Sequence, residues 1–268
     1  MTEEDLDVPT IVAISALSYA LANVVHEGLG HGGACLLLGA RPTMFNAIFF
    51  SYDESTASDV VRRVISAAGS IASVLIGLPL IVWLRGRATL APRWRYFLWL
   101  FCAVNLLTAF GYLLYSGVGG IGDWAHVIQG SRLAIVFRLV FVAVGAWLYF
   151  VAAPRLLMPG LDPFLGREDP IRGQRAKRLS LLPYLVGGIT LVVAGLFNPL
   201  GMRIVLISAA AASFGGTSLL AWYPARARPS SAATDTPIGI GRSIPWIIAA
   251  AIGVALFVCV LGPGIGKT

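Results

Sequence analysis

Long apolar runs with almost no charge dominate this sequence and limit what it can fold into. Of 268 residues, 57% are hydrophobic and only 12% are charged, whereas a soluble domain carries about 25% charged residues. A helix needs about 20 apolar residues to cross the roughly 30 Å hydrocarbon core of a bilayer, and the runs have this length. They cover residues 9–38, 64–84, 96–115, 133–153, 181–197, 204–222 and 244–261. The sequence therefore predicts an all-α, polytopic bundle of about seven transmembrane helices.

The connections between the runs refine this arrangement. Only a few residues around Pro199 separate the fifth and sixth runs, and a helix does not continue into a proline, so we expect a tight helical hairpin there. Six spans remain if either run is re-entrant. Residues 2–7 are acidic where a cleavable signal peptide would be basic, so we expect the first run to be retained as a helix. We expect a single membrane domain, with the motifs in residues 1–130 and further helices in 131–268.

Basic residues gather in alternate connections. Residues 85–95, 155–180 and 224–243 hold 13 of the chain's 20 lysines and arginines. Positive-inside bias places these connections and the N-terminus in the cytoplasm. The net charge of +7 is then a topology signal beside anionic headgroups, and no basic, aromatic-rich soluble domain indicates nucleic-acid binding. Few lysines and many arginines, alanines and glycines suggest a high-GC bacterial genome and hence a bacterial plasma membrane.

Two of the three histidines, His26 and His31, lie with Glu27 inside the first run. Ionisable groups at membrane depth are costly and usually functional, although neighbouring helices can also satisfy such groups. In a His-Glu-x-x-His motif the two histidines share one face of a helix and bind zinc, and the glutamate is the general base. Here the histidines are five residues apart, which separates them by about 140° on an ideal α-helix. Gly28 and Gly30 permit a π-bulge or local unwinding that brings both onto one face.

Three segments carry a resemblance to a known family. The segment His26-Glu-Gly-Leu-Gly-His through Leu-Gly-Ala-Arg41 resembles the catalytic helix of the site-2 protease family of intramembrane zinc metalloproteases, with one residue inserted to give HExxxH. Residues 67–73 resemble the family's Ala-Gly-Pro-x-x-Asn element, with serines in place of the proline and asparagine. Residues 105–124 resemble a third element that begins with asparagine and ends in Asp-Gly, but here Trp124 follows the aspartate.

The resemblance implies a zinc site. His26 and His31 are its expected ligands, and Asp123 matches the position of the family's third ligand. Asp123 can equally be a turn residue in a glycine-rich loop. His126 follows three residues later and is an alternative third ligand, a partner that orients Asp123, or a loop histidine without a role.

The resemblance also implies a reaction, the hydrolysis of a peptide bond in or near a transmembrane segment of a membrane protein or peptide. Glu27 would act as general base on a zinc-activated water. Asn105 would orient the substrate or stabilise the oxyanion, although it can instead bond between helices. Residues 44–50 would form a membrane-associated strand or re-entrant loop.

Three observations keep other functions open. The distribution of lysine and arginine predicts that the first helix runs from the cytoplasm outward, whereas the catalytic helix of family members usually runs in the opposite direction. A non-hydrolytic relative that binds or chaperones membrane partners is one alternative, because the inserted residue alters the metal geometry. A transporter or a zinc hydrolase acting on lipid amides is another, supported by polar residues in the spans and by glycine pairs at 187–188 and 215–216.

Overall fold

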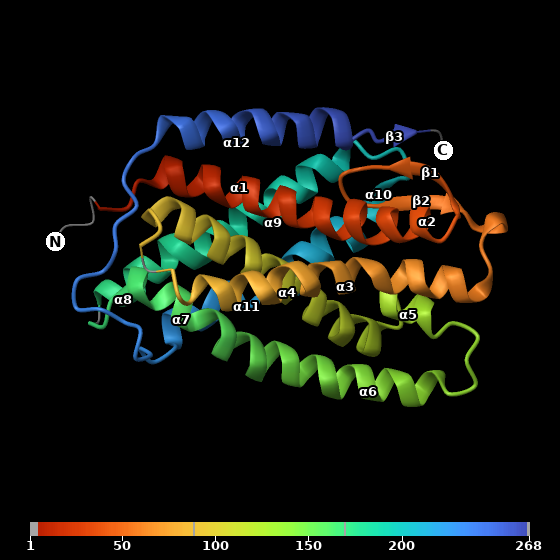
Figure 1. Cartoon of the computed structure of the whole chain (residues 1–268), viewed down its shortest axis with the longest axis horizontal. Coiled ribbons are helices and arrows are strands. Elements are labelled where there is room, and N and C mark those ends of the chain that lie inside the picture. Colours follow the sequence, from red (N-terminus) through yellow and green to blue (C-terminus); the bar gives the residue numbers. More distant parts are fainter. Residues whose placement is uncertain (1–4, 88, 169, 267–268) are drawn as a thin grey trace.

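Helices that run back and forth along the molecule make up most of the structure (Figure 1). The computed structural model describes residues 5–87, 89–168 and 170–266, so residues 2–4 of the acidic N-terminal segment lie outside the described residues. Within the described part, seven helices are long and apolar enough to cross a membrane. They are Val8–Leu37, Asp59–Leu84, Pro92–Gly119, Ala134–Leu165, Ile171–Leu196, Met202–Arg226 and Ile244–Leu261. The predicted helical membrane bundle is confirmed.

Several of these spans combine α-helical and π-helical segments. The α-helices are α1 (Val8–Val24), α2 (Gly33–Leu37), α3 (Asp59–Leu84), α4 (Pro92–Gly119), α5 (Asp123–Val127), α6 (Ala134–Trp147), α7 (Ala153–Leu165), α8 (Ile171–Ala176), α9 (Leu182–Leu196), α10 (Met202–Ile204), α11 (Leu219–Arg226) and α12 (Ile244–Leu256). The π-helices are η2 (Val25–Gly32), η4 (Leu148–Ala152), η5 (Lys177–Leu181), η6 (Val205–Gly215) and η7 (Phe257–Leu261), and η3 (Glu54–Thr56) is a 3₁₀-helix. The strands are β1 (Arg41–Phe45), β2 (Phe50–Asp53) and β3 (Ile265–Gly266).

Helix ends follow local sequence signals. The Asp7 carboxylate caps α1 by accepting a hydrogen bond from the Thr10 backbone N–H at 2.9 Å, which satisfies a donor that the first turn leaves free. Proline stands in the first turn of α4 and α12, where its missing N–H costs nothing. Gly120 ends α4 in the left-handed conformation with φ of 66°. The predicted hairpin between the fifth and sixth spans is confirmed, because only residues 197–201 join α9 to α10.

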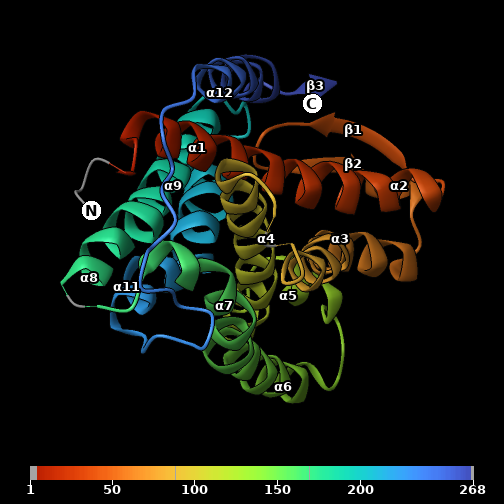
Figure 2. The same ribbon diagram turned by 60° about the vertical axis from the view of Figure 1, so that its left-hand side comes forward.

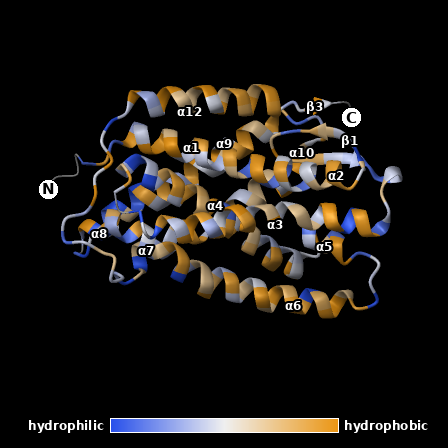
Figure 3. Cartoon of the chain, in the orientation of Figure 1, coloured by the Kyte–Doolittle hydropathy of each residue, from blue (hydrophilic) through white to orange (hydrophobic). Residues whose placement is uncertain are grey.

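The third span lies at the centre of the bundle, and two others lie at its outside. Most of the α4 span is buried, and it packs against α1, α3 and α6. In the spans that contain α6 and α12, only 11% of the apolar length is buried, and Figure 3 shows both helices as largely hydrophobic at the outside of the bundle, which suits helices surrounded by lipid. One continuous core joins residues from both halves of the chain, from Leu6 to Phe257. The helices after residue 130 therefore belong to the same packed unit as the motif-bearing helices.

A small antiparallel sheet, with strand order β2-β1-β3, covers the motif segment and is the one departure from an all-α fold among the described residues. Figure 2 shows its hairpin beside the end of the first span. The Phe45 and Phe50 rings lie over Gly28 and Gly32, where an added Cβ would come within 3.2 and 3.3 Å of them. Residues 44–50, predicted to be a strand or a re-entrant loop, form the end of β1, the turn and the start of β2.

The two ends of the bundle differ in what they carry. The connections with most basic residues lie at the end that holds α7, α8 and the N-terminus. The sheet, α2, α5 and α10 lie at the opposite end (Figure 1). The histidine motif is therefore at the end away from the basic loops.

Candidate metal centre

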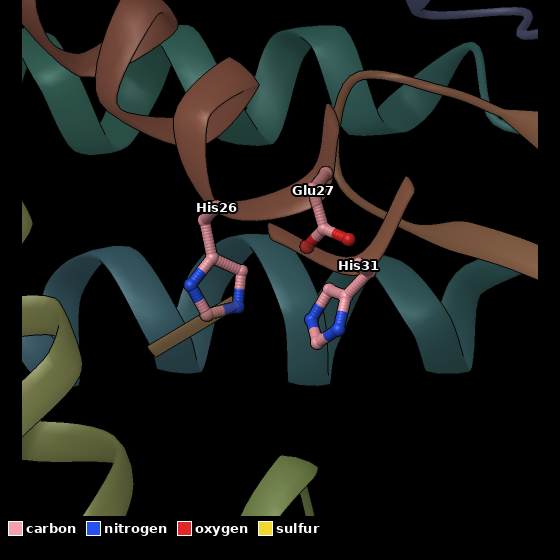
Figure 4. Close-up of side chains that lie close together, drawn as sticks. All are labelled: His26, Glu27 and His31. Carbon is pink, nitrogen blue, oxygen red and sulfur yellow. The ribbon is translucent and has the colours of Figure 1, made fainter. Parts of the chain in front are cut away.

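The histidine motif is wound as a π-helix. Val25–Gly32 forms η2, with α-helix before and after it, and i→i+5 hydrogen bonding brings residues five apart next to each other. The His26 and His31 rings meet edge to face with centroids 4.9 Å apart, and Figure 4 shows both rings on the same side of the helix as the Glu27 carboxylate. The predicted π-helical distortion, which brings residues five apart onto one face, is confirmed.

Asp123 joins these histidines from a different part of the chain. Its Oδ2 lies 3.0 Å from His26 Nε2 and 3.5 Å from His31 Nε2. Ligand atoms about 2.0–2.1 Å from a tetrahedral zinc ion are about 3.3 Å from one another. Both distances from Asp123 are close to this value, the ligand atoms of the two histidines lie within 4.8 Å of each other, and the donor set of two imidazoles and a carboxylate suits zinc.

His126 does not take part in this cluster. Among the described residues, His26, Glu27 and His31 form a group with the spacing of metal ligands. Asp123 contacts both histidines of this group, and His126 is not a member of it. His126 instead lines the outer part of the cleft described below. The geometry thus favours Asp123 over His126 as the third ligand.

The short helix α5 is fastened to α3, and this positions Asp123. The Trp124 indole N–H donates to Ser70 Oγ at 3.2 Å. Arg63 donates to the carbonyl oxygens of Val127 at 2.5 Å and Gln129 at 2.8 Å. Ser70 and Trp124 are two positions at which the sequence departs from the site-2 protease pattern, and here they bond to each other.

The hydrogen bonding of His31 leaves one ring nitrogen free for a metal. Its Nδ1 lies 2.7 Å from the Ile65 carbonyl oxygen, and because a carbonyl only accepts, Nδ1 carries the proton. In the neutral ring the Nε2 lone pair then points toward the Asp123 carboxylate. Without a metal, Nε2–H of a protonated ring faces this carboxylate at 3.5 Å, and a bound metal ion would take the place of that proton. Metal-binding histidines commonly have this second hydrogen bond to a backbone carbonyl.

Gly69 of α3 makes room for both imidazoles. A Cβ at this position would lie 2.5 Å from His31 Nε2 and 2.7 Å from His26 Nε2. Gly30 is needed for a different reason, because its added Cβ would lie 2.5 Å from the Gly69 Cα and would keep η2 away from the backbone of α3. The backbones of η2 and α3 are therefore in direct contact next to the cluster, and the 67–73 segment of α3 forms one side of the site.

The motif residues are buried, and Asp123 is the most exposed member of the cluster, with 20% of its side chain exposed. His26, Glu27 and His31 are 3%, 6% and 8% exposed. Burial opposes ionisation of Asp123, but the charge of His31 and hydrogen bonds with both histidines outweigh it and hold the pKa of this carboxyl below its ordinary value of 3.8. Asp123 is thus a carboxylate at neutral pH. A Glu27 oxygen lies within 4.8 Å of ligand nitrogens on both histidines, a separation that a water molecule can bridge.

A cleft of about 450 Å³ opens beside the cluster. Glu27, His31 and Asp123 lie in its wall with residues of β2, the end of α4 and the start of the sixth span. Tyr112 lines this cleft and packs on His26, with ring centroids 5.1 Å apart. The sequence interpretation missed Tyr112, and its position two helical turns after Asn105 was the available signal.

Asn105 does not line this cleft. Its side chain is 1% exposed, its Nδ2 donates to the Phe101 carbonyl at 2.9 Å, and it borders a small internal cavity that His26 also lines. The predicted contact of Asn105 with substrate stays a prediction, and the position suggests a different role, developed below.

Comparison of the chain with protein-family models, curated proteins and solved structures finds no match. Function is therefore inferred from the geometry of the residues themselves.

Proposed function

We propose that this protein is an intramembrane zinc metalloprotease, which hydrolyses a peptide bond in or near a transmembrane segment. One observation carries the proposal: the Asp123 carboxylate lies 3.0 and 3.5 Å from the Nε2 atoms of His26 and His31, close to the spacing of zinc ligands, and Glu27 lies within 4.8 Å of both histidines. His26, His31 and Asp123 would hold the ion. A fourth position would remain for water or substrate, as in catalytic zinc sites.

Zinc, when bound, supplies a Lewis acid that polarises a carbonyl and lowers the pKa of water. Glu27 accepts a proton as the water oxygen bonds to the scissile carbonyl carbon. The same carboxyl then delivers that proton to the amide nitrogen as the C–N bond breaks, so that a carboxylic acid, which retains the second proton of the water, and an amine leave. The burial of Glu27 excludes competing water and strengthens its electrostatic effect on the reacting groups.

The cleft supports a peptide as the substrate. Phe50, Ser51 and Tyr52 of β2 lie in its wall, and β2 is an edge strand of the sheet. An edge strand offers backbone N–H and C=O groups to an extended peptide, and this favours a peptide bond over a lipid amide. Tyr112, which lines both the cleft and an apolar cavity of about 370 Å³, stands where an apolar side chain of the substrate would enter.

The position of the site indicates the side of the membrane on which cleavage occurs. The cluster is at the end of the bundle opposite the basic connections, which positive-inside bias assigns to the cytoplasm. Cleavage would then take place near the outer face of a plasma membrane, on segments that reach the cleft from that side.

The proposal is tested with purified protein in liposomes and a mixed library of synthetic transmembrane peptides, with the products identified by mass spectrometry. Wild type should cleave a subset of peptides, and a zinc chelator should stop cleavage. Glu27→Gln should keep the metal and lower the rate about 10²- to 10⁴-fold. Glu168→Gln, an exposed glutamate at the other end of the molecule, is the matched control. Cleavage by Glu27→Gln at the wild-type rate would contradict the proposal.

A further inference from the structure

His26 lines a small internal cavity of about 10 Å³, which shares only Tyr112 with the lining of the cleft. Its lining comes from the first, second, third, fifth and sixth spans. Three of its polar neighbours have partners: Tyr19 bonds Thr217, Ser213 bonds the Ala209 carbonyl, and Asn23 bonds the Ala47 carbonyl. Three others each have a buried polar atom without a partner among the described residues.

Three unpartnered polar atoms belong to residues that line this one cavity. They are His26 Nδ1, Ser73 Oγ and Asn105 Oδ1, each buried and without a hydrogen-bond partner among the described residues. Buried polar atoms are almost always hydrogen-bonded. Three unpartnered atoms from three different spans around one cavity indicate a common partner.

The cavity is the right size for a single water molecule. A water needs about 10–15 Å³ of space by this measure and two to four polar partners, and both conditions are met here. The donors and acceptors also balance. With a metal on Nε2, the water would accept a hydrogen bond from His26 Nδ1–H and donate its two hydrogens to Ser73 Oγ and Asn105 Oδ1. Without a metal, His26 Nε2–H donates to Asp123, and the same water donates to Nδ1 and to Asn105 Oδ1 and accepts from the Ser73 hydroxyl.

This arrangement would act on the metal site through His26. The Nε2 of His26 faces Asp123, and Figure 4 shows its other ring nitrogen pointing away from His31. For Nε2 to bind a metal as a neutral imidazole, Nδ1 must carry the proton. His31 meets the same requirement through the Ile65 carbonyl, whereas His26 has no protein acceptor among the described residues.

We propose that Ser73 and Asn105 hold an internal water that accepts a hydrogen bond from His26 Nδ1 and so fixes the orientation and tautomer of this ligand. Ser73 and Asn105 are positioning residues, and neither touches substrate. The inference rests on the proposed zinc site for its functional meaning, but the water itself does not depend on the metal.

The first test is an experimental structure at a resolution that shows ordered water, with and without zinc. The expected result is one water bonded to His26 Nδ1, Ser73 and Asn105 in both states. A cavity without water density, or a His26 Nδ1 bonded to another group, would overturn the proposal. This result stands even if the protein binds no zinc, in which case only the proposed function fails.

The second test is zinc affinity by competition with a chelator. Ser73→Ala and Asn105→Leu should each weaken binding about 10-fold, and the pair up to about 100-fold, as losses of outer-shell partners do. Ser73→Thr, which keeps the hydroxyl, should restore affinity. Ser15→Ala removes a buried serine that bonds within its own helix and is the control. Wild-type affinity in both folded variants, with zinc bound by wild type, would overturn the proposal.

Discussion

Gly69→Ala tests whether the two imidazoles converge where the structure puts them. The added Cβ would stand 2.5 Å from His31 Nε2 and 2.7 Å from His26 Nε2, whereas ordinary contacts begin at 3.4 Å. The nitrogens must therefore retreat by about 0.9 and 0.7 Å, well beyond the roughly ±0.2 Å within which metal–ligand distances vary. Both ligands are displaced, so we expect zinc affinity to fall at least about 100-fold, or about 2.7 kcal/mol.

The same change has a smaller effect on the fold. Overpacking costs about 1–3 kcal/mol, and the better helix propensity of alanine returns about 1 kcal/mol, so the variant should still fold. Gly253→Ala is the matched control, because its Cβ meets only the flexible end of Leu17. Chelator competition gives the affinity, and thermal unfolding in detergent gives the stability. A folded Gly69→Ala protein with wild-type zinc affinity would refute the described geometry of the site.

Two predictions concern the opposite end of the molecule. In the wild type, the buried Arg172 guanidinium, 3% exposed, pairs with Asp162 at 2.6 Å. Asp162→Ala leaves this guanidinium as a buried unpaired charge, so the free energy of unfolding should fall by about 3–5 kcal/mol. An unchanged melting temperature would contradict this prediction. Asp7→Ala should cost about 1 kcal/mol at neutral pH. The hydrogen bond from the Thr10 hydroxyl lowers the folded-state pKa of Asp7 below its ordinary value of 3.8. The stabilisation by the Asp7 cap is therefore complete above pH 3.8 and is lost as the pH falls through the folded-state pKa. The difference in melting temperature between wild type and Asp7→Ala should therefore shrink below about pH 4, and a constant difference would contradict the capping role.

The bundle and the distorted motif helix were predictable because each follows from local sequence. Apolar length alone defines the spans. The five-residue separation of His26 and His31, with glycines between them, requires a winding other than the α-helix if the rings are to meet. The sequence pattern also placed Asp123 in the region of the site, although a loop residue at position 123 has no periodicity that fixes its direction.

The remaining features depend on contacts between distant segments. The role of Gly69 under the imidazoles arises only when α3 packs on η2, and no local pattern encodes that approach. Tyr112 and the internal cavity at Asn105 and Ser73 likewise involve separate spans. The β-sheet was only partly predictable, because the pairing of β3 with β1 joins residues more than 200 apart in sequence.

The most direct measurement is the zinc content of detergent-purified protein, for wild type and single alanine variants that elute as folded, monodisperse species. Wild type should hold about one zinc per chain. His26→Ala, His31→Ala and Asp123→Ala should lose it, and His126→Ala should retain it, since His126 lies outside the cluster. Folded wild type without zinc after incubation with excess metal would contradict the metalloprotease account. Loss of zinc in His126→Ala but not in Asp123→Ala would contradict the assignment of the third ligand.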